Sequence, residues 1–246
     1  MARPGLPSGS PFKRVADALD CGYEHRQAEM LRWMLCAGFE VMGMKSFETI
    51  PEKALPKVRN ALKVYEETVL DCEPFTDILG PVYMDLASRW GRSALGQFFT
   101  PQSIAVMMAM MTIGDEEPRG RLVTACDPTC GSGVMMLSLA QVLLRQGEPD
   151  RLRRYSFTGV DLDPICARMM AMQFLANCAI HRLEVGELVV FWGDSLLPWT
   201  KMDLLVHATS PSLQPEVVVP AAHPARIWAI QAAAQSQLPL FEEWAA

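Results

Sequence analysis

The segment ACDPTCGSGVMML, residues 125–137, joins an acidic residue to a short loop that contains two glycines. An apolar stretch typical of a strand precedes the loop, and an apolar stretch typical of a helix follows it. Gly131 and Gly133 would let backbone N–H groups approach a ligand at the positive end of the new helix. A G-x-G fragment alone also fits a tight strand-to-helix turn without a ligand, so the neighbouring segments must decide.

Further acidic residues follow the next two predicted strands. Asp161 ends the segment TGVD, and Asp194 ends the segment FWGD. Asp163 competes with Asp161, but the following Pro164 favours a helix cap at Asp163. Ligands of α/β sheets bind outside the carboxyl ends of the strands, where an acidic residue after the second strand holds ribose hydroxyls. The sequence therefore predicts one ligand-binding edge that carries Asp127, Asp161 and Asp194.

The residues around the loop restrict the ligand. No G-K-[ST] ending follows the glycines, which excludes a P-loop. Asp127 stands directly before the loop, where it would repel phosphate and attract a positive amino or sulfonium group. The pattern indicates S-adenosylmethionine rather than NAD or ATP, and no metal site is predicted.

Four segments are expected along the chain. Residues 1–11 are rich in Pro, Gly and Ser and predict a flexible leader, and residues 12–95 predict a helical region. Residues 96–220 alternate strand and helix patterns, which is typical of a parallel α/β sheet, and residues 221–246 predict a helix and a tail. The expected helices of the first region are Pro11–Phe39, Pro56–Leu70 and Phe75–Trp90.

The α/β region supplies the elements that must position the acidic edge. Gly147 is a candidate cap for the helix that follows the glycine loop. The expected strands are Leu122–Cys126, Tyr155–Val160, Leu188–Trp192 and Met202–Val206, and the expected helices are Gln102–Met111, Gly133–Arg145, Pro164–Ile180 and Pro224–Ala234.

Composition restricts the cellular setting. Half of the 246 residues are apolar and the net charge is −6, which is unfavourable for an autonomous nucleic-acid binder. The seven cysteines show no disulfide framework, so reduced thiols in a cytoplasm are expected. The most apolar run, Ile104–Ile113, is shorter than the about 20 residues of a membrane span. With no signal peptide, the sequence predicts a cytoplasmic, nucleoid-associated protein without a membrane contact.

Taken in this order, the segments resemble the adenine-N6 DNA methyltransferases, particularly the modification subunits of type I restriction systems. DPTCGSG at 127–133 is similar to the family's cofactor loop, GVDLDP at 159–164 to its ribose-binding segment, and GDSL at 193–196 to the loop that meets the cofactor's adenine. The stretch from Asp77 to Pro101, which ends in GQFFTP, resembles the element that precedes the cofactor loop. The resemblance covers about residues 75–211 and implies a Rossmann-like methyltransferase sheet that is incomplete at its C-terminal side.

The resemblance implies S-adenosylmethionine as cofactor and DNA as partner. It places Phe99 and Thr100 at the methionine end of the cofactor, although a buried aromatic pair beside an ordinary helix cap also fits these residues. Thr100 before Pro101 suits a helix start, and the helix Gln102–Met111 is expected to be buried. The residues expected at the cofactor are Gln97, Phe99, Thr100, Asp127, Thr129, Cys130, Gly131, Gly133, Asp161 and Asp194.

The family's catalytic motif is not intact. In the family the fourth strand ends in Asn-Pro-Pro and an aromatic residue, which orient the adenine amino group and stack on the flipped base. The segment HATSPS puts Thr209, Ser210, Pro211 and Ser212 at these positions. Losing an oriented acceptor typically costs about 10²–10³ in rate, and the missing ring removes a further ~1–3 kcal/mol of stacking. His207 as a substitute base would not restore the orientation.

Three functional hypotheses follow. We favour a cofactor-binding relative with lost or weak catalysis in a restriction-modification, anti-restriction or mobile-element context. The second is an active adenine-N6 methyltransferase that a partner subunit completes, because only about 35 residues follow the fourth strand. These are too few for the remaining strands and a target-recognition region. The fourth strand would be an exposed edge unless Glu216–Pro220 or another chain covers it.

The third hypothesis concerns the tail. QLPLF at 237–241 resembles the peptide with which replication proteins bind the sliding clamp, and such peptides bind in an extended form. A tail that packs its own Leu and Phe on the core is the alternative. If the cofactor site is lost, the chain would be a non-enzymatic interaction module tethered to the clamp. The expected clamp contacts are Gln237, Leu238, Leu240 and Phe241.

Overall fold

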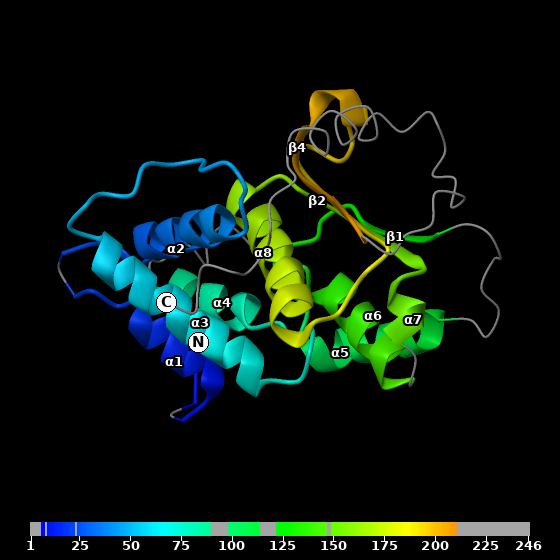
Figure 1. Cartoon of the computed structure of the whole chain (residues 1–246), viewed down its shortest axis with the longest axis horizontal. Coiled ribbons are helices and arrows are strands. Elements are labelled where there is room, and N and C mark those ends of the chain that lie inside the picture. The colour runs from blue at the N-terminus through cyan, green and yellow to red at the C-terminus, as the bar shows by residue number, and fades with distance from the viewer. Residues whose placement is uncertain are drawn as a thin grey trace.

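The computed structural model describes residues 6–7, 9–22, 24–89, 98–113, 122–146 and 149–210. A helical part precedes a four-stranded sheet, and helix α8 lies between the two (Figure 1). The helices of the first part are α1 (Pro11–Ala18), α2 (Gln27–Val41), α3 (Leu55–Asp71) and α4 (Leu79–Arg89).

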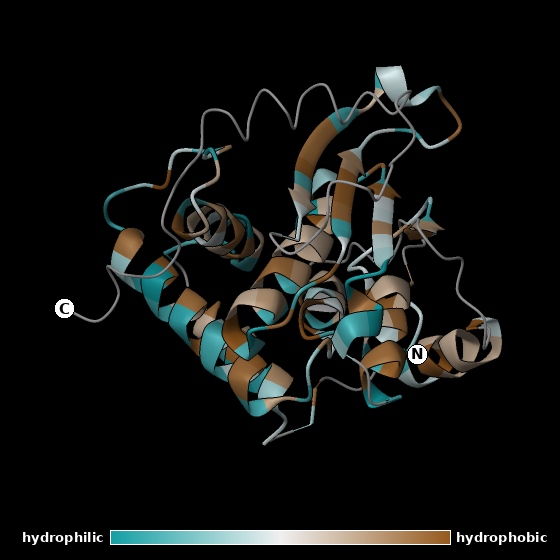
Figure 2. Ribbon diagram, turned by 45° about the vertical axis from the view of Figure 1, so that its right-hand side comes forward, coloured by the Kyte–Doolittle hydropathy of each residue, from teal (hydrophilic) through white to brown (hydrophobic). Residues whose placement is uncertain are grey.

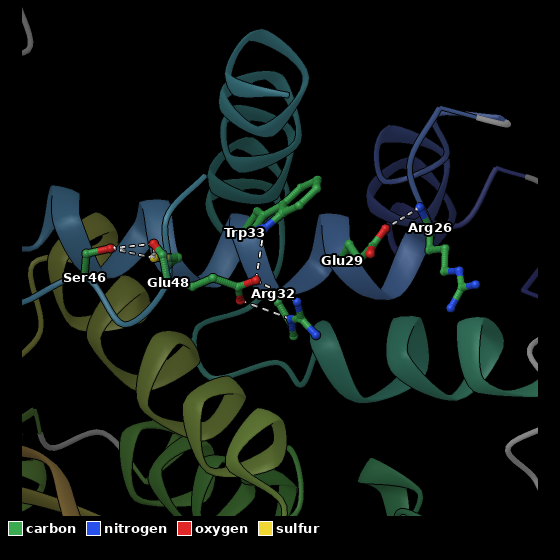
Figure 3. Close-up of polar contacts among 7 residues, drawn as sticks. Arg26, Glu29, Arg32, Trp33, Ser46 and Glu48 are labelled. Carbon is green, nitrogen blue, oxygen red and sulfur yellow. Dashed lines mark hydrogen bonds and ion pairs between the residues drawn. The ribbon is translucent and has the colours of Figure 1, made fainter. Parts of the chain in front are cut away.

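The single helix predicted over Pro11–Phe39 is wrong, because the chain turns between α1 and α2. Gly22 adopts a φ of 62°, a left-handed conformation that a glycine takes without steric cost. Its N–H donates to the Asp20 carboxylate at 2.9 Å, which closes the turn. The side chain of Glu29, in the first turn of α2, then accepts the N–H of Arg26 at 3.0 Å (Figure 3). The apolar spacing therefore predicted the helical residues but missed the break.

The loop after α2 folds back onto that helix. Glu48 accepts two hydrogen bonds from the Arg32 guanidinium, at 2.6 and 3.1 Å, and one from the Trp33 indole at 3.2 Å (Figure 3). The Ser46 hydroxyl donates to the Glu48 carbonyl at 2.8 Å. These contacts hold residues 46–48 against α2, and they stabilise the helical part away from the acidic edge.

The sheet has the strand order β1-β2-β3-β4. Strands β1 (Val123–Asp127), β2 (Tyr155–Asp161) and β3 (Glu187–Trp192) run parallel. Strand β4 (Asp203–Thr209) runs antiparallel to β3. The remaining helices are α5 (Gln102–Thr112), α6 (Val134–Arg145), α7 (Pro149–Leu152) and α8 (Pro164–His181).

The antiparallel β4 corrects the predicted all-parallel sheet. A parallel neighbour needs a crossover of about a dozen or more residues, usually a helix. Between β3 and β4 the chain has only residues 193–202, with a short 3-10 helix over Trp199–Lys201. The chain therefore turns back beside β3, and Thr209 pairs with Glu187 at the start of that strand.

Apolar packing joins the helical part to the sheet. One cluster of buried side chains extends from Val15 in α1 to Val206 in β4. Within it, the Phe174 ring of α8 lies 5.1 Å from the Phe157 ring of β2 and 5.7 Å from the Phe75 ring, measured between centroids. Strand β3 is mostly apolar and β2 mixes apolar with small and polar residues, and the helices of the first part also carry polar and apolar residues (Figure 2). Helix α8 thus packs against both the helical part and the sheet.

Helix α5 is not buried as predicted. It packs on α6, with Ala105 and Ala109 buried. Met107, Met110 and Met111 are 52%, 65% and 78% exposed. The small alanine side chains let the two helices approach, so the larger side chains remain outside.

The predicted cap of α5 is also wrong. Pro101 is the N-cap residue and no side chain caps the helix, so the Thr100 hydroxyl does not fill that role. None of the helices in the described ranges has the length and apolar character of a membrane span.

Candidate functional site

The carboxyl edge of the parallel strands brings the predicted acidic residues together. Asp127 ends β1 and pairs with Gly159, and Asp161 ends β2 and pairs with Trp192. Asp194 follows β3 after Gly193, whose N–H donates to the Asp161 carbonyl at 2.9 Å. The sequence prediction of a shared acidic edge is therefore confirmed in position.

The glycine loop connects β1 to α6 as predicted. Gly131 has a φ of 55° and Gly133, which precedes α6, has a φ of 92°. A Cβ at Gly133 would lie 2.7 Å from Cγ of Met170 in α8, so the loop needs glycine there to approach α8. Both glycines are therefore required by the turn itself.

The loop's N–H groups do not point to a ligand as expected. The Gly131 N–H donates to Asp161 Oδ2 and the Gly133 N–H to the Cys130 carbonyl, each at 2.8 Å. The Cys130 N–H donates to the Val160 carbonyl at 2.8 Å, and the Thr129 N–H donates to Asp127 at 3.0 Å. Because these four donors already have partners inside the protein, the carboxylates rather than the amides are the groups left to meet a ligand.

The acidic residues repel one another at this edge. Burial raises the pKa of both Asp127 and Asp161 above the ordinary value of 3.8. The charges of Asp163 and Asp127 raise the pKa of Asp161 further, against the lowering effect of the N–H groups that it accepts. A ligand with positive charge would relieve this repulsion, and the free lone pairs of the carboxylates could accept ligand hydroxyls.

Asp163 and Asp194 complete the edge. Asp163 caps α8 by accepting the Ile165 N–H at 2.9 Å, as predicted. Asp194 accepts the Leu196 N–H at 3.0 Å and so shapes the loop after β3. Large apolar side chains on the loops beside these acids are exposed, namely Leu162 at 72%, Leu196 at 91%, Leu197 at 49% and Trp199 at 45%. The edge therefore offers apolar surface next to carboxylates, which suits a ligand with a flat ring and a charged end.

Phe99 lies against the glycine loop. Its ring stacks on the Tyr83 ring with centroids 5.5 Å apart, and a Cβ added at Gly131 would lie 3.0 Å from its Cε1. The Tyr83 hydroxyl donates to Asp163 at 3.4 Å. The aromatic partner is thus Tyr83 of α4, which sequence reasoning did not single out, whereas Phe98 is 60% exposed.

The other predicted residues of the loop differ in exposure. Thr129 is exposed at the edge, and Thr100 is half-buried. Cys130 is only 2% exposed, and burial together with nearby carboxylates raises the pKa of its thiol well above the ordinary value. The thiol therefore belongs to the interior behind the loop. Gln97 lies outside the described residues.

The predicted catalytic position lies away from this edge. Thr209 is the last residue of the antiparallel β4, and Ser210 comes next. Both lie at the edge of the sheet where β3 begins. The Ser210 N–H donates to the Gly186 carbonyl at 3.0 Å, and its hydroxyl donates to Glu184 at 2.7 Å. Thr209 and Ser210 therefore lie away from the carboxyl edge that carries Asp127 and Asp161. Pro211, Ser212 and the tail contacts Gln237, Leu238, Leu240 and Phe241 lie outside the described residues.

His207 belongs to a polar chain across the sheet. Its Nε2 lies 2.8 Å from Glu187 Oε1, and the Ser156 hydroxyl donates to the other oxygen of Glu187 at 2.5 Å. The carboxylate stands between the hydroxyl and the imidazole, so the imidazole does not contact Ser156 as a base would contact a serine nucleophile. This arrangement agrees with a structural role for His207.

A buried polar network behind the glycine loop was missing from the sequence predictions. Its members are Asp77, Ser132 and Gln173, all 3% exposed or less. Its sequence signal is the pair of amides Gln173 and Asn177, four residues apart in the otherwise apolar α8. Amides at such a spacing lie on one face of a helix and need polar partners in the interior.

Comparison with known proteins adds three findings. The family model for N-6 DNA methylases matches residues 75–211. The type I restriction enzyme MpnII methylase subunit of Mycoplasma pneumoniae is 25% identical over 123 residues, which cover 49% of this chain and 21% of that protein. The chain thus spans about a fifth of that relative's length. A solved structure from Listeria monocytogenes, described as a putative class I S-adenosylmethionine-dependent methyltransferase, matches with a TM-score of 0.41 and 15% identity over 80% of this chain and 55% of that one.

Proposed function

The chain belongs to the N-6 DNA methylase family, and from that premise we propose that it binds S-adenosylmethionine while transferring little or no methyl group to adenine. The binding site is the carboxyl edge of β1, β2 and β3. S-adenosylmethionine supplies an electrophilic methyl group on a positively charged sulfur. The residues at the edge fit such a cofactor, because two half-buried carboxylates of raised pKa gain from a nearby positive charge.

Each cofactor residue has a proposed task. Asp161 accepts ribose hydroxyls with the lone pairs that its backbone partners leave free. Asp127 faces the positive end of the cofactor, and Phe99 packs beside that end above Gly131. Leu162 and Leu196 cover the adenine ring, which agrees with their exposure of 72% and 91%.

The direction of β4 carries the proposal of weak catalysis. Thr209 and Ser210 follow this strand to the opposite edge from Asp127 and Asp161. Neither residue offers the amide oxygen that orients an adenine amino group. Position and residue type therefore support the same conclusion independently.

The setting of this activity is DNA modification. The relative in Mycoplasma pneumoniae is a subunit of a restriction enzyme, and we propose that this chain also acts on or near DNA together with other restriction-modification subunits. The net charge of −6 agrees with a need for a partner in DNA binding.

A second candidate is an active adenine-N6 methyltransferase that a partner subunit completes. Among the strands in the described ranges, β1 pairs only with β2, so its other edge can accept a strand. A partner that adds a strand beside β1 could bring an adenine-binding segment to the cofactor. This candidate predicts methyl transfer only in the complex.

Two assays on one sample test the proposal. Isothermal titration with S-adenosylmethionine should give binding in the micromolar range, and Asp161→Ala should abolish it. Transfer of a radiolabelled methyl group to duplex DNA should stay at background for the chain alone. No binding heat would contradict the cofactor assignment, and transfer that appears only with restriction-modification subunits would favour the second candidate.

A further inference from the structure

The buried carboxylate of Asp77 lies behind the glycine loop. It is 3% exposed and stands between α3 and α4, at the start of the segment that leads into α4. Its Oδ1 accepts the Gly80 N–H at 2.9 Å and the Gln173 side-chain amide at 2.8 Å, and its Oδ2 accepts the Ser132 hydroxyl at 2.9 Å. All three donors are neutral groups.

Ser132 lies between the two glycines of the loop, and two of its atoms form hydrogen bonds with buried side chains on the interior side of the loop. Its hydroxyl donates to Asp77, and its carbonyl accepts the Gln173 amide at 2.9 Å. The neighbouring Gly131 N–H is held from the front by Asp161 at 2.8 Å. The loop is therefore fixed between a carboxylate in the interior and a carboxylate at the ligand edge.

The same network fastens the chain before α4. The Gln173 carbonyl oxygen accepts the N–H groups of Ile78 and Leu79 at 2.7 and 2.9 Å. A Cβ at Gly80 would lie 2.1 Å from Asp77 Oδ2 and 2.7 Å from the Ser132 hydroxyl, so only glycine leaves room for this contact. Ser132 and Gln173, which are 55 and 96 positions from Asp77 along the chain, thus meet at its carboxylate.

Burial raises the pKa of Asp77, while its three hydrogen bonds act in the opposite direction. A carboxylate without a cationic partner is costly in the interior unless its hydrogen bonds are complete. Removing one donor would therefore disturb the whole network, and the Ser132 hydroxyl is the donor that reaches the loop.

We propose that Asp77 is a positioning residue for the cofactor, which acts through Ser132 to hold the glycine loop in its binding conformation. The inference rests on the proposed cofactor binding. Asp77 itself contacts no ligand, because the loop lies between it and the acidic edge. Its hydrogen bonds link the start of α4 and the side chain of Gln173 in α8 to Ser132, and so fix the turn that positions Asp127 and Phe99.

Ser132→Ala is the sharpest test, because it removes one hydroxyl and leaves the backbone unchanged. We expect its dissociation constant for S-adenosylmethionine to rise about tenfold or more, since a hydrogen bond to a charged group is lost and the carboxylate remains buried. Hydrogen exchange of the amides in residues 129–134 should become faster. Thr68→Val is the matched control, because it also removes a buried hydroxyl, one that donates at 2.7 Å to the Val64 carbonyl in α3. This control should leave the dissociation constant within about twofold and the loop exchange unchanged.

Two variants of Asp77 test whether its hydrogen bonds, rather than the stability of the protein as a whole, determine the affinity for the cofactor. Asp77→Ala removes all three acceptor contacts and should weaken binding more than about tenfold. Asp77→Asn keeps the shape, and the Ser132 hydroxyl can turn to accept its amide, so affinity should stay within about threefold of the parent. Failure of Asp77→Asn to restore binding would contradict positioning by hydrogen bonds.

The outcomes distinguish this inference from the proposed function. If the parent protein gives no heat with S-adenosylmethionine, the proposed function is wrong, and loop exchange still tests the network. If Ser132→Ala has parental affinity and parental loop exchange, the positioning role is wrong. An equal loss of affinity in Thr68→Val would also overturn it, since the effect would then follow from general destabilisation.

Discussion

At the residue scale, the carboxylates of the acidic edge are less stable in their ionised form when no cationic ligand is bound. Burial raises the pKa values of Asp127 and Asp161, and the charges of Asp163 and Asp127 raise the pKa of Asp161 further. Their ionised forms cost free energy without a ligand, and stability from these groups is lost as the pH rises through their folded-state pKa values. A cation at the edge reverses that cost.

Cofactor affinity should therefore depend on pH. A positive ligand binds the ionised carboxylates, so affinity should fall as the pH drops through the raised pKa values, which lie above 3.8. Isothermal titration between about pH 4 and 8 would measure it. Asp127→Asn should bind more weakly at neutral pH and show a shallower dependence. Affinity that is constant over this range would contradict the role of the carboxylates.

A second prediction at this scale concerns Tyr65. Its side chain is fully buried, and within the described part of the chain its hydroxyl has no hydrogen-bond partner. Burial accordingly raises its pKa. Tyr65→Phe removes the unsatisfied group and should raise the free energy of unfolding by about 1 kcal/mol. Urea denaturation would measure the change, and a loss of stability would show that the hydroxyl has a stabilising contact.

At the element scale, the direction of β4 separates this structure from the sequence expectation. Apolar runs predicted β1, β2, β3 and helices α6 and α8 to within one residue at each end, because each run of apolar residues is bounded by polar or glycine-containing loops. The same pattern contains no information on which strand is the neighbour of β4. The short connection over residues 193–202 determines the neighbour and the direction of β4. Apolar periodicity predicts the elements but does not take the length of their connections into account.

A cysteine pair tests the strand pairing. Leu188 in β3 lies opposite Ala208 in β4, so Leu188→Cys with Ala208→Cys should form a cross-link under mild oxidation, seen by mass spectrometry as a joined peptide. Ala208→Cys combined with Ala125→Cys in β1 is the matched pair and should stay open. Cross-linking of the β1 pair instead would mean that β4 lies beside β1, which would contradict the pairing of β4 with β3.

Helix α5 gives a further prediction at this scale. High apolar content predicted burial, but only the small side chains of Ala105 and Ala109 are buried. Ala105→Leu should therefore cost about 1–3 kcal/mol of unfolding free energy through overpacking. Met111→Gln should change it by less than about 0.5 kcal/mol, because Met111 is 78% exposed. Thermal denaturation of both variants would measure these changes. A large loss for Met111→Gln with none for Ala105→Leu would mean that the opposite face of α5 is buried.

At the scale of the whole molecule, the helical part and the sheet share one apolar cluster. Sequence patterns separated a run of helices from a run of alternating strands and helices, but they could not show that α8 contacts both. Gly38 of α2 faces α8, and a Cβ there would lie 2.3 Å from Cε of Met172, so that side chain would have to move. Contacts between distant segments of this kind leave no local periodicity, which also explains why Asp77 was not expected to reach Ser132.

The shared cluster predicts cooperative unfolding. Urea unfolding followed by circular dichroism and by tryptophan fluorescence should give coincident transitions. Gly38→Val should shift both by the same amount, with a loss of about 1–3 kcal/mol, because the larger side chain must displace Met172 between α2 and α8. Two separate transitions, with only one affected by Gly38→Val, would show that the parts fold independently.

The central claim is a cofactor site without an adjacent adenine-orienting segment. Its most direct measurement is a single-turnover assay, in which the chain is saturated with radiolabelled S-adenosylmethionine under conditions of proven binding and mixed with excess duplex DNA that contains many adenines. We expect the cofactor to stay bound and the DNA to remain unlabelled. Transfer of one methyl group per bound cofactor by the chain alone would contradict it.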